Sequence, residues 1–389
     1  MVFALDAALA LIAFVGHFAL AVYLFNRVLA KPWPWRFVKT LDRLIILGAA
    51  VVLLAGIVAS AVYGGFAVNW RDGHFQMSWP VLAYVTICWA CAALVLPLWL
   101  GPKLVERIPA ALVANDTAVL DVAARLGYQP VGSAKARTLA RVRGTQIFQP
   151  HIQRKTLRLA NLPAELEGLT IAHLTDLHMT GDLTEEFYRE IVAATNSLTP
   201  DLVAITGDIL EKSPCLPWIP RTLGQLTARH GKFFILGNHE LRLGDVAPLR
   251  QALVESGLID LGSRALLHPV RETEILLAGT ELPWFGTAPT LPLAPSPRFR
   301  LLLSHTPDQL TWARENGFDL MLAGHNHGGQ IRLPWLGALI SPSRFGSRYA
   351  GGVYDEPPTL LHVSRGISGV PPIRLNCPPE IALLVLTRG

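Results

Sequence analysis

The chain has 389 residues, a net formal charge of +5 and a mean hydropathy of +0.36. This is too apolar for one soluble domain, and the apolar residues are concentrated in the first hundred positions, which excludes a wholly soluble protein. Four cysteines are too few and too scattered for a disulfide framework. We therefore expect a membrane segment followed by a soluble domain.

Three apolar stretches at the start of the chain are each close to the ~20 residues that a helix needs to cross about 30 Å of hydrocarbon. Tryptophans lie at or beside their ends, where their rings favour the headgroup region. No basic segment precedes the first stretch and no clear cleavage site follows it, which disfavours a signal peptide. The sequence predicts a membrane segment over 1–105, with spans at about 7–25, 44–61 and 79–100.

Positive charge is concentrated on one side of these predicted spans. The loop between the first two spans carries five basic residues, Arg27, Lys31, Arg36, Lys39 and Arg43. The positive-inside rule places this loop in the cytoplasm. Three crossings then place the N-terminus outside and the soluble domain in the cytoplasm. A basic connector over 106–150 would lie against anionic headgroups, and we expect no nucleic-acid polymer as a partner.

Polar residues within the predicted spans are candidate functional groups, because ionisable side chains are costly in lipid. The first span carries Asp6 and His17, for which the sequence offers no partner. The third carries Cys88 and Cys91 in the sequence CWAC, which is either a redox pair or two small residues of a membrane helix. One alternative function is therefore a membrane redox or transport protein that the soluble domain regulates.

Beyond residue 150, short apolar runs alternate with helical patterns, which is typical of an α/β domain. A domain over 151–389 is long enough to bury a substantial core. Helices are predicted at 117–126, 184–198 and from 307 to about 316, the last two after capping residues. Strands are predicted at 169–174, 201–206, 232–236, 275–279, 300–304, 319–323, 359–364 and 381–387.

Five of the predicted strands are followed directly by polar residues. In open α/β sheets, ligand sites assemble at the carboxyl ends of the strands, so we expect these side chains to meet at one edge. The segments are TDLH at 175–178, GD at 207–208, GNHE at 237–240, His305, and GHNH at 324–327.

Carboxylate, amide and imidazole donors together suit a divalent ion such as Mn, Fe or Zn, and not an all-oxygen calcium site or a thiolate zinc site. The segments above carry more donors than one ion can use. Two ions about 3.5 to 4 Å apart that share a carboxylate would use them all, and such pairs stabilise the attacking and leaving oxygens of phosphoryl transfer.

The ordered motifs D-x-H (176–178), G-D-x-x-E (207–211), G-N-H-E (237–240), S-H-x-P (304–307) and G-H-x-H (324–327) resemble those of the calcineurin-like metallophosphoesterases. The segments GGQIRLP at 328–334 and ISGVPPIRLNCPPEI at 367–381 are similar to the membrane-associated bacterial branch of the YkuE and YaeI type. The resemblance covers roughly residues 155–389. It implies a four-layer α/β/β/α sandwich and a bacterial hydrolase of phosphoric esters. The first 150 residues lie outside the resemblance, so the expected location in the cytoplasmic membrane rests on their composition.

The resemblance also implies roles for individual residues. Asp176, His178 and His327 would bind one metal ion, Asn238, His305 and His325 would bind the other, and Asp208 would bridge them. His239 would contact the phosphate and protonate the leaving oxygen as a general acid. Glu240 either orients His239 or is an ordinary glutamate at the start of a helix.

The function predicted from these features is a membrane-anchored phosphodiester or pyrophosphate hydrolase whose two metal ions activate a bridging water, with a lipid-linked compound as one candidate substrate. Arg344 and Arg348 could clamp a substrate phosphate through bidentate hydrogen bonds. The second alternative function is a degenerate binding scaffold, but such a protein is expected to have lost ligands. The sequence implies no obligate protein partner.

Overall fold

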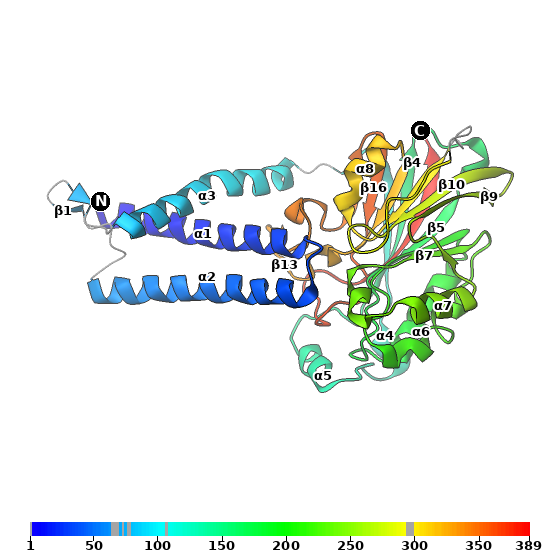
Figure 1. Cartoon of the computed structure of the whole chain (residues 1–389), viewed down its shortest axis with the longest axis horizontal. Helices are drawn as coiled ribbons and strands as arrows, with labels where there is room; N and C mark the ends of the chain where they lie inside the picture. Colours follow the sequence, from blue (N-terminus) through cyan, green and yellow to red (C-terminus); the bar gives the residue numbers. More distant parts are fainter. Residues whose placement is uncertain (1, 64–69, 72–73, 76–78, 106–107, 293–298) are drawn as a thin grey trace. The chain divides into compact units, whose positions relative to one another are not determined.

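The structure is a computed structural model, and it describes residues 2–63, 70–71, 74–75, 79–105, 108–292 and 299–389. The chain divides into two compact units (Figure 1). The first comprises Met1–Arg107 and Pro342–Arg348, and the second comprises Ile108–Ser341 and Tyr349–Gly389. Each unit is described below by itself.

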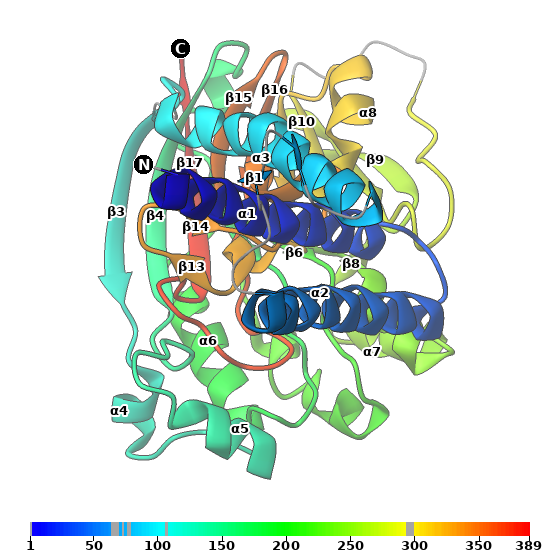
Figure 2. The ribbon, with the colours of Figure 1, turned by 90° about the vertical axis from the view of Figure 1, so that its left-hand side faces the viewer.

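The first unit is built from three long helices, α1 (Val2–Leu29), α2 (Trp35–Tyr63) and α3 (Trp79–Val105), with the short strands β1 (Trp70–Arg71) and β2 (His74–Phe75). Helix α1 packs beside both α2 and α3 and lies between them in Figure 2. Two segments, Ala8–Leu29 and Trp79–Pro97, are long and apolar enough to cross a membrane. Their positions agree with the first and third predicted spans.

The prediction of three spans is corrected at the middle one. Helix α2 begins with a charged stretch, Trp35–Arg43. Among the residues that the structure describes, two helices and not three meet the requirements of length and composition for crossing a membrane.

His17 connects the three helices, although the sequence offered it no partner. Its ring is buried, with Nε2 3.0 Å from the carbonyl oxygen of Ala49 on α2 and Nδ1 2.5 Å from the hydroxyl of Tyr84 on α3. A carbonyl oxygen only accepts, so Nε2–H donates to Ala49 and Nδ1 accepts from Tyr84. Cys88 and Cys91 are free thiols, and the side chain of Asp6 lies outside the described residues.

The second unit contains two large sheets. One has the strand order β15-β16-β12-β11-β10-β9 and the other β3-β4-β17-β5-β6-β7-β8. Strands β5, β6 and β7 are parallel to one another, as are β10, β11, β12 and β16. The strands are β3 (Leu112–Val119), β4 (His151–Leu159), β5 (Thr170–Leu174), β6 (Leu202–Thr206), β7 (Lys232–Ile235), β8 (Ile259–Asp260), β9 (Arg264–Val270), β10 (Thr273–Thr280), β11 (Arg300–Ser304), β12 (Leu320–Ala323), β13 (Arg332–Leu333), β14 (Gly337–Ala338), β15 (Gly352–Glu356), β16 (Thr359–Val363) and β17 (Glu380–Arg388).

Alternate residues of these strands divide between two hydrophobic cores. One core joins the facing sides of the two sheets, through residues such as Ile171, Leu277 and Leu303. The other covers the outer side of the seven-stranded sheet with α6 (Glu185–Ser197) and α7 (Ala247–Glu255), while α8 (Leu310–Glu315) contacts β16 of the six-stranded sheet. This mixed arrangement of helices and sheets is consistent with the predicted fold class.

Residues 108–150, which the sequence assigns to a basic connector, belong to the second compact unit. Strand β3 pairs with β4 along its length and belongs to the seven-stranded sheet, and α4 (Val122–Leu126) and α5 (Ala134–Ala140) follow it. The helix predicted at 117–126 is therefore wrong in its first part, because Thr117–Val119 lie in β3. This edge strand is exposed over most of its length, so it lacks the alternation of apolar and polar residues that identifies a half-buried strand.

Candidate metal centre

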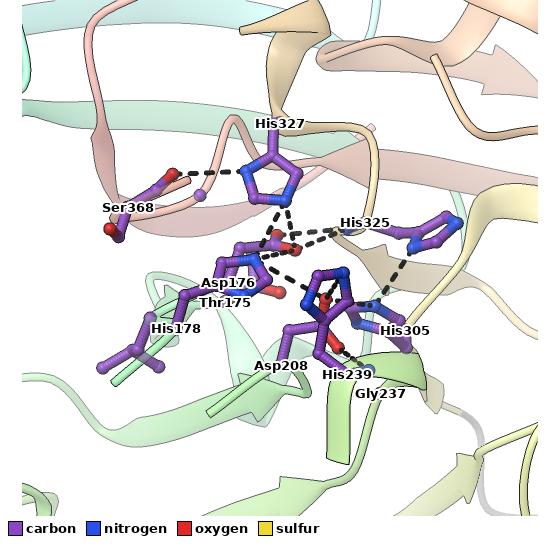
Figure 3. A network of polar contacts seen from close by, with 12 residues as sticks. Thr175, Asp176, His178, Asp208, Gly237, His239, His305, His325, His327 and Ser368 are labelled. Atoms are coloured by element: carbon purple, nitrogen blue, oxygen red, sulfur yellow. Dashed lines mark hydrogen bonds and ion pairs between the residues drawn. The ribbon is translucent and has the colours of Figure 1, made fainter. Parts of the chain in front are cut away.

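The predicted site residues follow strands of both sheets and converge at the carboxyl ends of those strands (Figure 3). Within the described residues, three overlapping groups have ligand atoms within 4.8 Å of one another and could hold metal ions. Asp208 belongs to two of these groups. The groups are Asp176, His178, Asp208 and His327; Asp208, His305 and His325; and His178, Glu211 and His239.

The backbone at this site is strained and closely packed. Five of the predicted ligands have positive φ, namely Asp176, His178, Asp208, His325 and His327. This conformation costs about 1–3 kcal/mol for a residue with a side chain, and it clusters at functional sites. The glycines of the motifs permit close approach. A Cβ on Gly207 would lie 2.6 Å from the nitrogen of Gly237, and one on Gly324 would lie 2.1 Å from Thr175 Oγ1.

His178 and His327 present their Nε2 atoms to one another at 3.0 Å, with Asp176 Oδ1 3.4 Å from the Nε2 of His327. Nδ1 of His178 lies 2.6 Å from Glu211 Oε1 and must carry a hydrogen, because a carboxylate only accepts. Nδ1 of His327 lies 3.2 Å from the carbonyl of Ser368 and 3.4 Å from Nη2 of Arg374. A cation fits this arrangement.

A second group of acceptors surrounds His305, which is fully buried. Its Nδ1–H donates to the carbonyl of Thr206 at 2.7 Å, so in the neutral ring, the form that can bind a metal ion, Nε2 carries the lone pair. That nitrogen lies 3.3 Å from Asp208 Oδ2, 3.1 Å from Asn238 Oδ1 and 3.2 Å from His325 Nδ1. Burial lowers the pKa of His305, but the Asp208 carboxylate outweighs it and raises the pKa to about 9. The same negative charge would attract a metal ion.

Asp208 lies between the two groups and is itself buried. Its Oδ1 accepts the backbone N–H of His239 at 2.8 Å. Its Oδ2 lies 3.6 Å from His178 Nε2 and 3.3 Å from His305 Nε2, and no donor within the described part of the chain hydrogen-bonds to it. A buried carboxylate oxygen without a donor is costly. Divalent ions on its two sides would compensate this charge, so the donor set fits a shared carboxylate.

Glu211 is the residue that orients His239. One of its oxygens, Oε1, lies 2.6 Å from Nδ1 of both His239 and His178, and its other oxygen contacts Arg242. Burial raises the pKa of Glu211, but the hydrogen bonds from the two histidines outweigh it and lower the pKa. An ionised Glu211 thus fixes both rings by their Nδ1 atoms. The Nε2 of His239 lies 3.9 Å from Asp208 Oδ2, at the edge of the candidate metal centre.

Glu240, the sequence-based candidate for orienting His239, has another role in the structure. Its buried carboxylate accepts the backbone N–H groups of Asp208 at 3.1 Å, Leu210 at 3.0 Å and Gly237 at 2.7 Å. It therefore holds the loop after β6 against the loop after β7, and supports Asp208 from behind.

Supporting residues from distant segments were not predicted from the sequence. Arg374 is fully buried and donates Nη1–H to the carbonyls of His327 and Arg365, each at 2.7 Å. Its Nη2–H donates to the carbonyl of Ser368, which also lies 3.2 Å from Nδ1 of His327. The segment 367–381 carries a family resemblance, but nothing local in it indicates that an arginine is buried. Arg344 and Arg348 belong to the first unit, and their role in substrate binding stays a prediction.

Comparison with known proteins shows that the sequence around this site is similar to that of metallophosphoesterases. The family model described as calcineurin-like phosphoesterase matches residues 169–329. The uncharacterized metallophosphoesterase YkuE of Bacillus subtilis is 28% identical, over 61% of this chain and 87% of its own length. Phosphodiesterase YaeI of Escherichia coli is 28% identical, over 59% and 86%. UDP-2,3-diacylglucosamine pyrophosphatase LpxG of Chlamydia muridarum is 26% identical, over 62% and 92%.

Proposed function

Because the chain contains a calcineurin-like metallophosphoesterase domain, we propose that it is a membrane-anchored phosphoric ester hydrolase that uses two divalent metal ions. Asp176, His178 and His327 would hold one ion, Asn238, His305 and His325 the other, and Asp208 both. The observation that carries this proposal is the buried Oδ2 of Asp208, which lies within 3.6 Å of ring nitrogens from both groups and accepts no hydrogen bond from the described residues.

The ions, when bound, would activate a water and neutralise charge on the phosphoryl group. The protein residues supply position and proton transfer. Burial lowers the pKa of His239, and Asp208 and Glu211 oppose this shift only in part. Glu211 accepts from Nδ1 of His239 and so orients the ring, whose protonated form can donate Nε2–H to a leaving oxygen. Glu240 fixes the Asp208 loop through backbone N–H groups, which keeps the donors in place before the substrate arrives.

For the substrate we propose a lipid-linked pyrophosphate or phosphodiester. The relative LpxG is named for a diacylated sugar nucleotide, and this chain carries two helices able to cross a membrane. Confinement to a surface raises the effective concentration of a substrate embedded in the same surface.

The test is hydrolysis by the purified full chain after removal of metal, with Mn, Zn or Fe added back singly. We expect at least one ion to restore turnover of a soluble chromogenic phosphodiester, of UDP-2,3-diacylglucosamine in mixed micelles, or of both. A chain that binds none of these ions and hydrolyses neither compound would overturn the proposal. Preference for the lipid compound at equal concentration would support the proposed substrate class.

We further propose that the catalytic unit lies on the cytoplasmic side, with the N-terminus outside. Basic residues follow the apolar part of α1, in 27–43, and also follow α3 in the chain, in the largely exposed segment 135–143. Both can be cytoplasmic only when α2 crosses as well. The hydrogen bond between His17 and Ala49 supports such a crossing, as do the exposed Leu47 and Leu54 of α2.

This orientation predicts how an added cysteine will react. Val254 on α7 is exposed, and the native Cys215 and Cys377 are buried. In intact bacterial cells we expect Val254→Cys to resist a membrane-impermeant maleimide and to react after permeabilisation, with the parent chain as the control. Reaction in intact cells at the permeabilised rate would place the catalytic unit outside.

A further inference from the structure

A hairpin of the second unit exposes apolar side chains next to the metal centre. The apolar hairpin, residues 331–340, contains the antiparallel pair β13 and β14. Ile331 is 43% exposed, Leu333 41%, Trp335 99% and Ile340 47%. Single exposed apolar residues are ordinary on soluble proteins, but several within ten positions indicate an interaction surface.

The base of the apolar hairpin is fixed to the metal centre. The N–H of Gln330 donates to the carbonyl of His327 at 2.9 Å, and Nε–H of Arg332 donates to the carbonyl of Gly328 at 2.9 Å. Backbone hydrogen bonds with Leu375, beside the buried Arg374, hold the other side of the base. The position of the tip of the hairpin is therefore coupled to that of His327 through a short segment that is held by hydrogen bonds.

The chemistry of the apolar hairpin fits a lipid surface. The chain has no acidic residue between Asp319 and Asp355, and Arg332 is the one charged residue within 331–340. A tryptophan with a neighbouring cation is typical of a membrane interface, where the ring favours the headgroup region and the cation favours anionic lipid.

The chain also brings a membrane close to this unit. Helix α3 ends at Val105 and the second unit begins at Ile108. At no more than about 3.6 Å per residue, this connection confines the unit to the neighbourhood of the membrane that α1 and α3 can cross.

We propose that the tip of the apolar hairpin, Trp335 with Leu333, inserts into the headgroup region of that bilayer and holds the metal centre against it. The insertion itself does not depend on the chemistry of the site. Its consequence, preferential turnover of a substrate embedded in lipid, rests on the proposed function.

Insertion is measured with the full chain reconstituted in vesicles of phosphatidylcholine and phosphatidylglycerol. A spin label at Trp335→Cys is compared with one at Leu267→Cys, a 44% exposed position on β9 of the same unit. We expect the label at 335 to collide mainly with oxygen, which concentrates in lipid, and the label at 267 to collide mainly with a water-soluble nickel complex. Equal access to nickel at both positions overturns the proposal. Protection of 335 from both reagents also overturns it, because that result means burial in protein.

The consequence for turnover is measured with Trp335→Ser and the control Leu267→Ser. We expect Trp335→Ser to lower turnover of a vesicle-embedded phosphodiester about tenfold, equivalent to about 1.4 kcal/mol, and to leave turnover of a soluble phosphodiester within about twofold. An equal loss on both substrates, or none on either, contradicts this consequence. If no variant hydrolyses anything, the proposed function fails, while the spin labels still decide whether the apolar hairpin enters lipid.

Discussion

The substitution Asp208→Asn is expected to reduce metal-dependent hydrolysis below about one per cent of the wild-type rate, a loss of more than about 2.7 kcal/mol of transition-state stabilisation. Asn keeps the size of the side chain, and its Oδ1 can still accept the N–H of His239. It removes the negative charge that lies between His178 and His305. The domain should therefore remain folded while the shared ligand is lost.

Metal-dependent stability provides a second measurement of the same substitution. A ligand that binds only the folded state raises the free energy of unfolding as its concentration increases. We expect added Mn or Zn to raise the melting temperature of the wild type and of the control Asp116→Asn, which lies on the exposed strand β3. The melting temperature of Asp208→Asn should respond much less. Activity above one per cent together with a wild-type response to metal would show that Asp208 is not a shared ligand.

The metal centre could be predicted from sequence because its donors occur in short segments, each directly after a strand. Strands β5, β6, β7, β11 and β12 are almost entirely buried, so they appear as continuous apolar runs. The carboxyl ends of such strands meet at one edge. The order of residues along the chain was therefore enough to expect Asp176, Asp208 and His305 together.

The supporting contacts could not be predicted in this way, because they join residues that no local pattern relates. Glu211 and Glu240 are both close to His239 in the fold, and only the structure shows that Glu211 contacts its ring while Glu240 accepts from the backbone. The burial of Arg374 depends on carbonyls from other loops. Strand β3 was missed for a related reason. It is held by its pairing with β4, which begins only at His151, and no local pattern in the sequence relates the two segments.

A buried ion pair behind the metal centre is a further contact of this kind. Lys155 of β4 contacts Glu380 of β17, with side chains only 4% and 1% exposed. Burial raises the pKa of Glu380, but Lys155 and Arg365 outweigh it and hold the pKa well below its usual range. Lys155 Nζ also lies 3.0 Å from His362 Nε2, and Nδ1 of His362 lies 3.0 Å from Nδ1 of His173.

These contacts fix the hydrogens of two histidines. The Lys155 ammonium only donates, so Nε2 of His362 accepts and its Nδ1–H donates to His173. Nε2–H of His173 then donates to the hydroxyl of Thr206 at 2.8 Å, and the carbonyl of Thr206 accepts from His305. His173 is thus a buried residue of strand β5.

Because each charge compensates the other, removal of one alone should be more damaging than removal of both. Glu380→Leu leaves a buried ammonium without a carboxylate, and Lys155→Met leaves the buried carboxylate of Glu380 with Arg365 as its remaining cation, at 3.3 Å. Each is expected to lower the free energy of unfolding by roughly 3–5 kcal/mol. The double variant should lose markedly less than the sum, measured as a double-mutant cycle by urea unfolding in detergent.

The pair Arg189 and Glu185 on α6 is the control, because its arginine side chain is 53% exposed. Its i,i+4 geometry is regular and its arginine is largely solvated, so Arg189→Ala should change the free energy of unfolding by less than about 1 kcal/mol. A large loss of stability at Lys155 and Glu380 with a small loss at Arg189 would show that the destabilisation comes from burial of the unpaired charge and not from the loss of an ion pair alone. Additive losses in the Lys155 and Glu380 cycle would mean that the two charges do not stabilise each other.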